Sequence, residues 1–254
     1  MTSRKPQSDE EKALLEKAKR YLPGAHLGNA PSTFDDGFVA REGRGSKIYD
    51  HSGNEYIDYL MGSGPMLLGH AHPAVVEAVR NHLEKGSTYF LTSAPAIELA
   101  EEVCRAVPCA EMVRFTTSGT DATFQCLRVA RTYRHRDKIL KFEGGYHGTH
   151  DYALMSYTPS SLLDFPQPLP GSGGIPRVIR ETVLIAPFND LETTSQIISD
   201  NHEDLAAVIV EPVQRILPPM AGFLEGLRDV TARYRIPLIF DEVVTGFRLA
   251  YGGA

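Results

Sequence analysis

The chain has 254 residues, enough to bury one large hydrophobic core or two smaller ones. Its formal net charge of −6 and its lack of a basic run argue against a general nucleic-acid-binding protein. No stretch of about 18 apolar residues occurs, so we expect no membrane-spanning helix, and the first twenty residues lack the apolar segment of a secretory signal. The three cysteines lack metal-ligand spacing and are typical of reduced thiols in a cytoplasmic protein.

The first 65 residues predict a helix followed by a small β-meander. A capping box formed by Ser8 and Glu11 indicates where the helix begins. The apolar face of this helix is expected to consist of Leu14, Leu15, Ala18 and Leu22. Short alternating runs in 38–60, on either side of a turn at 51–54, are typical of antiparallel hairpins. We therefore expect residues 1–65 to form a segment separate from 66–254.

Residues 66–254 predict an α/β domain. Two helices over 72–86 and 93–107 come first. The expected elements then follow in this order: strand 112–117, helix 118–136, strand 138–144, a Gly/Pro/Ser-rich loop over about 156–180, strand 182–188, helix 190–200, strand 206–212, helix 222–235 and strand 237–242. Short apolar strands alternating with helices predict a mostly parallel sheet with helices on both faces.

Ligands in an open α/β sheet bind beyond the carboxyl ends of the strands, so the residues that follow each strand are the candidates for a site. Small, polar, aromatic and acidic residues follow five of the predicted strands, in the segments TTSGTDA, EGGYHG, PFND, EPVQ and DEVVTG. Such residues suit a planar, anionic ligand that contains nitrogen.

The segment Ser118-Gly119-Thr120 connects a predicted strand to a predicted helix. The start of a helix offers unpaired N–H groups and the positive end of the helix dipole, which together favour a phosphate. A plain capping interaction between Ser118 and Asp121 would explain the same residues without a ligand. Both interpretations stay open on this motif alone.

Tyr146 follows two glycines just after a strand, where an aromatic ring could lie over a flat ligand or simply fill a loop. The nearby His147 and His150, together with Glu143, raise the possibility of a metal site. However, they lie in a glycine-rich loop and not at ligand spacing on a helix face, which disfavours a metal.

Asp241 ends an apolar strand, where an unpaired carboxylate would be costly to bury. A protonated pyridine nitrogen would remove that cost through a charge-assisted hydrogen bond of about 1.5–3 kcal/mol. Val243 and Val244 follow and could pack on a ring face. The same pattern resembles the acidic motif of phosphate-loop ATPases, but the chain has no G-x-x-x-x-G-K-[ST] motif, which argues against nucleotide binding.

Taken together, the motifs resemble the class III pyridoxal-phosphate aminotransferases of fold type I, and most closely the glutamate-1-semialdehyde 2,1-aminomutase branch. The resemblance is carried by LPGA, GHAHPAVVEAV, SGTDAT, RDKILKFEGGYHG, FND, VIVEPV, GFLEGLR and LIFDEVVTGFRLAYGGA. It implies pyridoxal 5'-phosphate as cofactor, an amino donor and a keto acceptor as small-molecule partners, and a homodimer.

The resemblance also implies a role for each site residue. Ser118, Gly119 and Thr120 would bind the phosphate. Tyr146 would stack on the pyridine ring, with Val243 on its opposite face. His147 would be a further cofactor-binding residue. Asp241 would pair with the ring nitrogen as the catalytic carboxylate, Glu211 would support the site, and Gln214 would lie near the ring hydroxyl.

Three questions stay open at the level of sequence. The family's Schiff-base lysine follows the last motif, and neither Lys138 nor Lys141 matches it. We therefore expect the lysine and a C-terminal part beyond residue 254, and an inactive fragment without them. The Arg that binds a substrate carboxylate in the aminomutases is missing from 22–34, which favours intermolecular amino transfer over the mutase reaction; Arg41, Arg44 or Arg177 could replace it. A non-catalytic scaffold is the remaining alternative.

Overall fold

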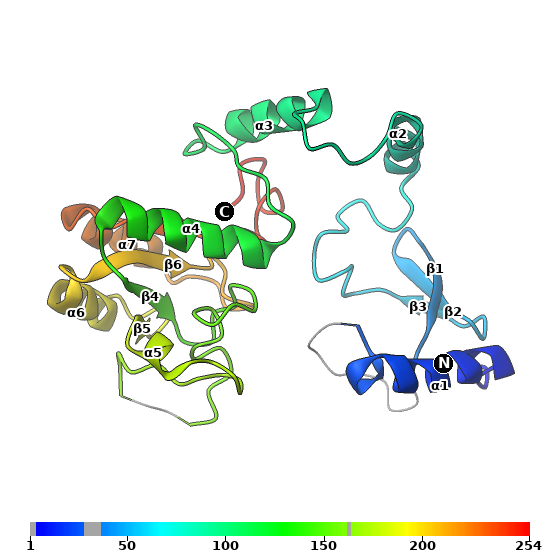
Figure 1. Cartoon of the computed structure of the whole chain (residues 1–254), viewed down its shortest axis with the longest axis horizontal. Helices are drawn as coiled ribbons and strands as arrows, with labels where there is room; N and C mark the ends of the chain where they lie inside the picture. Colours follow the sequence, from blue (N-terminus) through cyan, green and yellow to red (C-terminus); the bar gives the residue numbers. More distant parts are fainter. Residues whose placement is uncertain (1–3, 28–36, 162–163) are drawn as a thin grey trace. The chain divides into compact units, whose positions relative to one another are not determined.

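The computed structural model describes residues 4–27, 37–161 and 164–254. The chain divides into two compact units, Met1–Ser93 and Ala94–Ala254, both drawn in Figure 1. The boundary after residue 65 that the sequence suggests falls inside the first unit, and it stays a prediction.

The first unit contains the predicted helix and meander. Its elements are α1 (Asp9–Tyr21), the 3₁₀ helix η1 (Pro23–Ala25), β1 (Ala40–Arg44), β2 (Lys47–Asp50), β3 (Glu55–Ile57) and α2 (Pro73–Leu83). The strands form an antiparallel sheet in the order β1-β2-β3, which confirms the meander.

The capping box at the start of α1 is only half formed. The Ser8 Oγ accepts a hydrogen bond from the Glu11 N–H at 3.2 Å, as predicted. The Glu11 carboxylate does not return to the Ser8 N–H, which donates to Ser52 Oγ at 2.8 Å instead. Glu11 accepts from Ser52 Oγ and from the Val39 N–H at 3.1 Å. This buried carboxylate therefore joins the helix to the meander, which a local motif could not indicate.

The second unit contains the predicted parallel sheet and its helices. Its elements are α3 (Ala94–Ala106), α4 (Gly119–Arg134), β4 (Lys138–Phe142), α5 (Arg177–Arg180), β5 (Val183–Ala186), α6 (Leu191–Asn201), β6 (Leu205–Val210), α7 (Phe223–Arg233) and β7 (Leu238–Phe240). The four strands are all parallel and lie in the order β5-β4-β6-β7. This arrangement confirms the expected fold class.

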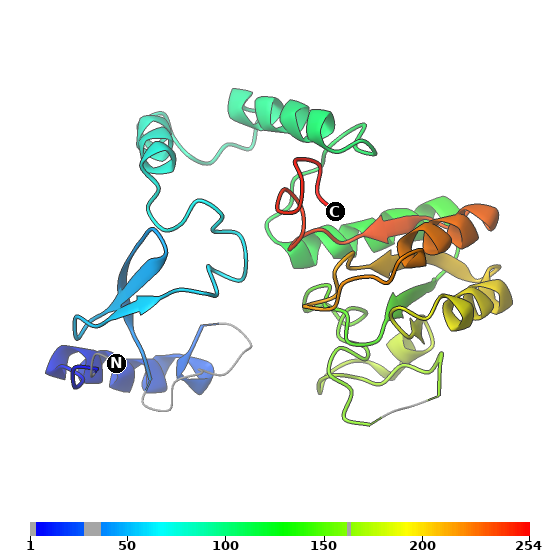
Figure 2. The same ribbon diagram turned by 180° about the vertical axis from the view of Figure 1, so that it is seen from behind.

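Helices cover both faces of this sheet. Successive side chains of a strand point to opposite faces, so the apolar strands present side chains on both. On one face, Ile139 and Ala207 pack with Leu127 of α4. On the other, Leu140 packs with residues of α6 and α7, including Leu227. Figure 1 shows α4 in front of the strands, and Figure 2 shows α7 from the opposite side. No helix in the described parts of the chain has the length and apolarity needed to cross a membrane.

The predicted strand over 112–117 is wrong: these residues form no strand in the structure. An extended segment becomes a strand only when a neighbouring backbone takes up its N–H and C=O groups. No described segment pairs with 112–117, and β7 is the last strand of the sheet on its side. Residues 112–117 therefore have a strand-like composition, but no segment within the described residues pairs with them.

Candidate functional site

Four segments of the second unit meet at the carboxyl edge of the sheet. Three are the segments that directly follow β4, β6 and β7, and the fourth is the start of α4. The hydrogen bond between His147 and Asp241 joins the first and third of these segments, and that between Tyr146 and Glu211 joins the first and second. Parallel strands predict this meeting of strand ends, because all their carboxyl ends lie at one edge.

Asp241 is held in place by three hydrogen bonds. Its backbone N–H donates to the Val210 carbonyl at 2.8 Å, which continues the pairing of β7 with β6. Its Oδ1 accepts from the Val243 N–H at 3.1 Å, and its Oδ2 lies 2.8 Å from His147 Nδ1. The residue is only 8% exposed. The carboxylate is thus fixed at the strand end, as expected, but its nearest partner is a histidine.

His147 is buried beside this carboxylate. Burial lowers the pKa of His147, and its hydrogen bond to Asp241 only partly opposes that effect. A neutral imidazole that donates from Nδ1 carries its lone pair on Nε2. His147 Nε2 is buried and has no hydrogen-bond partner among the described residues. The His147 carbonyl accepts from Thr123 Oγ1 at 2.7 Å, which ties this loop to α4.

Glu211 supports the turn that carries Tyr146. Its carboxylate accepts from the Tyr146 backbone N–H at 2.8 Å. Burial raises the pKa of Glu211, whereas this hydrogen bond acts to lower it. Tyr146 remains 38% exposed, so its side chain is available to a ligand.

The start of α4 has both a side-chain cap and unpaired backbone amides, the two interpretations that the sequence left open. Ser118 is the N-cap, and its Oγ accepts from the Asp121 N–H at 3.1 Å. Among the described residues, the amides of Gly119 and Thr120 have no partner. A Cβ placed on Gly119 would lie 3.1 Å from a methyl group of Val243, so the helix start lies directly against the segment after β7.

Gln214 contributes a second buried polar atom that lacks a partner within the described ranges. Its amide Nε2 donates to the Glu143 carbonyl at 2.8 Å, which fixes the orientation of the amide and leaves Oε1 free. A Cβ built on Gly145 would lie 3.2 Å from His147 Nε2 and 3.4 Å from this Oε1. Both unpaired acceptors therefore border the same space beside Gly145.

Lys141 is a site neighbour to which the sequence analysis assigned no role. It lies on β4, is fully buried, and donates from Nζ to the carbonyls of Gly145 at 3.0 Å and Met155 at 2.6 Å. Burial lowers its pKa to about 7. The sequence did contain a signal for this role: Lys141 lies within the apolar run KILKF. Lysine is rarely buried without a specific partner, so a lysine in a buried strand indicates one.

Arg215 and Tyr157 are the other neighbours that were missed. The Arg215 guanidinium lies 5.1 Å from the centroid of the Tyr146 ring and 4.6 Å from that of Tyr157. The two rings are themselves 5.2 Å apart. Arg215 comes directly after the strand-end segment EPVQ, but nothing local indicates that its side chain turns back to Tyr146.

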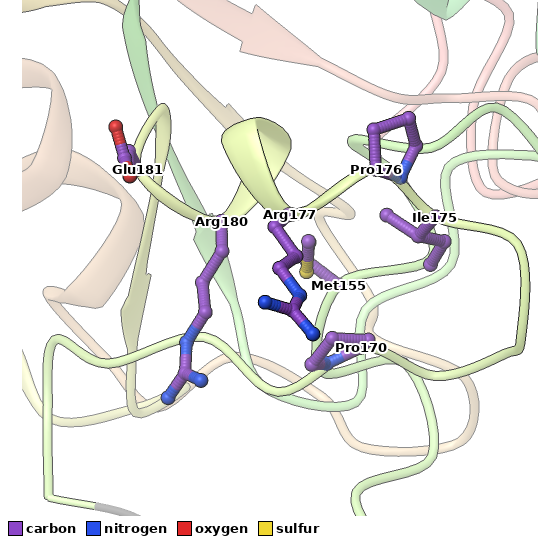
Figure 3. A pocket seen from close by; sticks show the side chains of 7 residues that line it. All are labelled: Met155, Pro170, Ile175, Pro176, Arg177, Arg180 and Glu181. Atoms are coloured by element: carbon purple, nitrogen blue, oxygen red, sulfur yellow. The ribbon is translucent and has the colours of Figure 1, made fainter.

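The three arginines considered as replacement cations belong to elements other than those that form the site. Arg41 and Arg44 belong to β1 in the first unit. Arg177 lines a cavity of about 300 Å³ together with Arg180, Met155 and Pro170 (Figure 3). None of the predicted cofactor residues lines this cavity. Part of the stretch 22–34, where an Arg was expected and is missing, lies outside the described residues.

The metal alternative gains no support from the site geometry. His150 Nε2 lies 3.2 Å from Thr123 Oγ1, and its Nδ1 accepts from the Ala153 N–H at 3.2 Å. No group of three His, Cys, Asp or Glu side chains within 4–27, 37–161 and 164–254 is arranged to hold a metal ion.

Comparison with known proteins gives one consistent result. The sequence model of the family described as "Aminotransferase class-III" matches residues 31–253. The glutamate-1-semialdehyde 2,1-aminomutase of Methanosphaera stadtmanae is 43% identical over 249 residues, which are 97% of this chain and 58% of that protein. The chain thus spans little more than half the length of this relative.

Solved structures agree with this match. An omega-transaminase from Sphaerobacter thermophilus superposes with a TM-score of 0.92 at 36% identity, over 98% of this chain and 58% of that one. A structure described as a transaminase with PLP bound gives a TM-score of 0.90 at 31% identity, with the same coverage of both chains. The fold is therefore that of the fold type I pyridoxal-phosphate transaminases, and the chain belongs to the class III aminotransferase family.

Proposed function

We propose that this chain supplies the cofactor-binding part of a pyridoxal-phosphate-dependent class III aminotransferase. The observation that carries the proposal is the position of Asp241. Its buried carboxylate is held at the end of β7 by the Val243 N–H and His147 Nδ1. Such a group would hold a pyridine nitrogen in its protonated form, because opposite charges in a buried place favour both charged states.

The residues around Asp241 fit the rest of the cofactor. The free amides of Gly119 and Thr120, at the positive end of the α4 dipole, are suited to a phosphate. Val243 lies against Gly119 and could cover one face of a ring, while the exposed ring of Tyr146 could stack on the other. Gln214 would lie near the ring hydroxyl, where its free Oε1 could accept a hydrogen bond.

The chain's own residues would bind and orient the group. When bound, pyridoxal phosphate supplies an electron sink for a carbanion beside an amino nitrogen. Asp241 would keep the ring nitrogen protonated, and His147 would keep the Asp241 carboxylate in place. Glu211 would hold the Tyr146 turn through its backbone N–H.

We propose intermolecular transfer of an amino group from an amino acid or amine to a keto acceptor. The likeness to the Sphaerobacter thermophilus omega-transaminase supports this reaction. The second candidate is the intramolecular aminomutase reaction, which is favoured by the 43% identity to the Methanosphaera stadtmanae aminomutase. Assays that supply either glutamate-1-semialdehyde alone or a separate amino donor with pyruvate would distinguish these reactions.

The homodimer implied by the family resemblance and the cytoplasmic location suggested by the three cysteines also remain proposals. Analytical ultracentrifugation of the full-length protein would test the first. Fractionation of cells that express the protein would test the second.

Substitution of Asp241 tests the central proposal. Asp241→Asn removes the charge and keeps the shape, so we expect pyridoxal-phosphate affinity to fall roughly 10- to 100-fold, as estimated from a charge-assisted hydrogen bond of about 1.5–3 kcal/mol. Titration of the cofactor-free full-length protein, followed by absorbance of the bound cofactor, measures this change.

Asp190→Asn is the matched control. Asp190 also follows a strand, but it caps α6 through the Thr193 N–H at 2.9 Å, a role that asparagine can take over. We expect this variant to bind the cofactor normally. Wild-type affinity in Asp241→Asn, or equal losses in both variants, would refute the proposed role.

A further inference from the structure

A tight turn after β6 places an arginine in a backbone conformation that glycine would adopt more easily. Gln214 and Leu217 exchange two backbone hydrogen bonds, from the Gln214 N–H at 3.0 Å and from the Leu217 N–H at 2.8 Å. Arg215 follows Gln214 inside this turn with φ of +59°. A left-handed conformation is sterically unfavourable for a residue that carries a Cβ. Such strain is often retained where the side chain serves a function.

The Arg215 side chain points to the candidate site from this turn. Its guanidinium lies over the rings of Tyr146 and Tyr157, 5.1 and 4.6 Å from their centroids. Its Nε donates to the Gly144 carbonyl at 3.4 Å, in the turn that carries Tyr146. The charge of Arg215 also acts to lower the pKa of Glu211, one of the two buried acidic residues of the site.

The guanidinium is free to bind an anion. No carboxylate in the described ranges forms a salt bridge with Arg215, and the residue is exposed. A guanidinium that lies on an aromatic ring keeps the N–H groups along its edge available, and their fork matches the two oxygens of a carboxylate. Lysine could offer the charge at this position but not the paired geometry.

We propose that Arg215 binds a carboxylate of the substrate beside Tyr146, so that the site takes amino and keto acids in preference to plain amines. This inference rests on the proposed function and specifies its substrate class. It also assigns a residue to the task for which Arg41, Arg44 and Arg177 were considered. Arg215 is distinguished from them by its contact with Tyr146, the expected neighbour of the cofactor ring.

The test compares binding of succinate with that of succinamide, which has the same length and no charge. Isothermal titration of the full-length protein with pyridoxal phosphate bound gives both affinities. We expect the wild type to prefer succinate by roughly tenfold or more, as a charge-assisted pair predicts. Arg215→Gln and Arg215→Gly should lose this preference, and Arg215→Lys should keep part of it.

Two controls accompany this test. The first separates the role of the side chain from effects on folding, and the second tests whether the effect is specific to Arg215. Arg215→Gly suits the positive φ, so its thermal unfolding midpoint should equal or exceed that of the wild type while the preference for succinate is lost. Arg177→Gln removes a different exposed arginine from the same unit and should keep the full preference.

The outcomes also separate this inference from the proposed function. Three outcomes would overturn the role of Arg215. The wild type could show no preference for succinate, or the preference could survive in both Arg215→Gln and Arg215→Gly. The preference could also disappear in Arg177→Gln. If the wild type does not bind pyridoxal phosphate, the proposed function fails. The same titrations without cofactor would then still decide whether Arg215 binds a carboxylate.

Discussion

His147 and Asp241 are 94 residues apart in the chain, yet their side chains meet in the interior with Nδ1 and Oδ2 separated by 2.8 Å. Burial lowers the pKa of His147, so the neutral ring donates this hydrogen bond from Nδ1. The histidine thereby restricts the carboxylate to one orientation. It is a positioning residue, because it acts on the proposed cofactor through Asp241.

Substitutions of His147 should distinguish the effect of its hydrogen bond from the effect of its side-chain volume. His147→Leu leaves Asp241 without this partner, and we expect pyridoxal-phosphate affinity to fall roughly 10- to 100-fold, following the 1.5–3 kcal/mol of a charged hydrogen bond. In His147→Asn, the amide nitrogen can take the place of Nδ1 and should restore most of the affinity. Absorbance titrations of both variants measure the effect; equal affinities in the two would contradict a positioning role.

Lys141 should make stability depend on pH in the alkaline range. Burial lowers its pKa from 10.5 to about 7, so between these values the unfolded chain holds a proton that the folded chain lacks. The free energy of unfolding should therefore rise with pH across this window, by up to about 1.4 kcal/mol per unit. Chemical denaturation of the wild type and Lys141→Met at several pH values measures the difference in slope.

The control for this experiment is Lys138→Met. Lys138 begins the same strand, but it forms an accessible ion pair with Asp204 at 2.9 Å. This variant should keep the slope of the wild type, whereas Lys141→Met should lose it. Parallel curves for the wild type and Lys141→Met would show that Lys141 keeps its charge in the folded state.

His150 should contribute to stability loss in acid. Burial lowers its pKa from 6.5 to about 4, so the folded state favours the neutral ring. Its contribution is complete above pH 6.5 and decreases as the pH falls from 6.5 to 4, because the unfolded chain takes up the proton first. The lowered pKa of His147 should likewise reduce stability as the pH falls. Thermal unfolding of His150→Asn should show a weaker pH dependence in this window than the wild type, and an unchanged dependence would contradict the assignment.

Gly148 should tolerate no side chain, because the loop after β4 lies against the start of α4. Its φ is +96°, and a Cβ there would lie 2.5 Å from Thr120 Oγ1 and 2.7 Å from Thr120 Cα. Gly174 has a similar φ of +87° with open space around it. Gly174→Ala should therefore cost about 1–2 kcal/mol from backbone strain alone.

Gly148→Ala adds a collision with backbone to the same strain, so it should destabilise the protein more than Gly174→Ala. Denaturant unfolding of both variants gives the two free energies. The Gly148 variant should also bind pyridoxal phosphate more weakly, since the collision would move the start of α4. Equal free energies for the two variants would show that the loop can move away from the helix.

Local sequence patterns predicted most of the fold. The spacing of apolar residues and the helix caps depend on neighbours within about one turn, so α1, α4 and the alternation of strands with helices could be predicted. The parallel sheet followed from that alternation, and it placed Tyr146, Glu211 and Asp241 at one edge. The strand predicted over 112–117 was wrong because a strand also depends on a partner elsewhere in the chain, which local patterns do not reveal.

The sequence by itself therefore determined the order of the elements, the class of the sheet and the edge at which the polar residues gather. Tertiary structure alone decided which of those residues touch. It paired His147 with Asp241, buried Lys141 under the Gly145 turn, and turned Arg215 onto Tyr146. These contacts join distant segments, and their geometry depends on strand register, loop conformation and packing, which no run of neighbouring residues specifies.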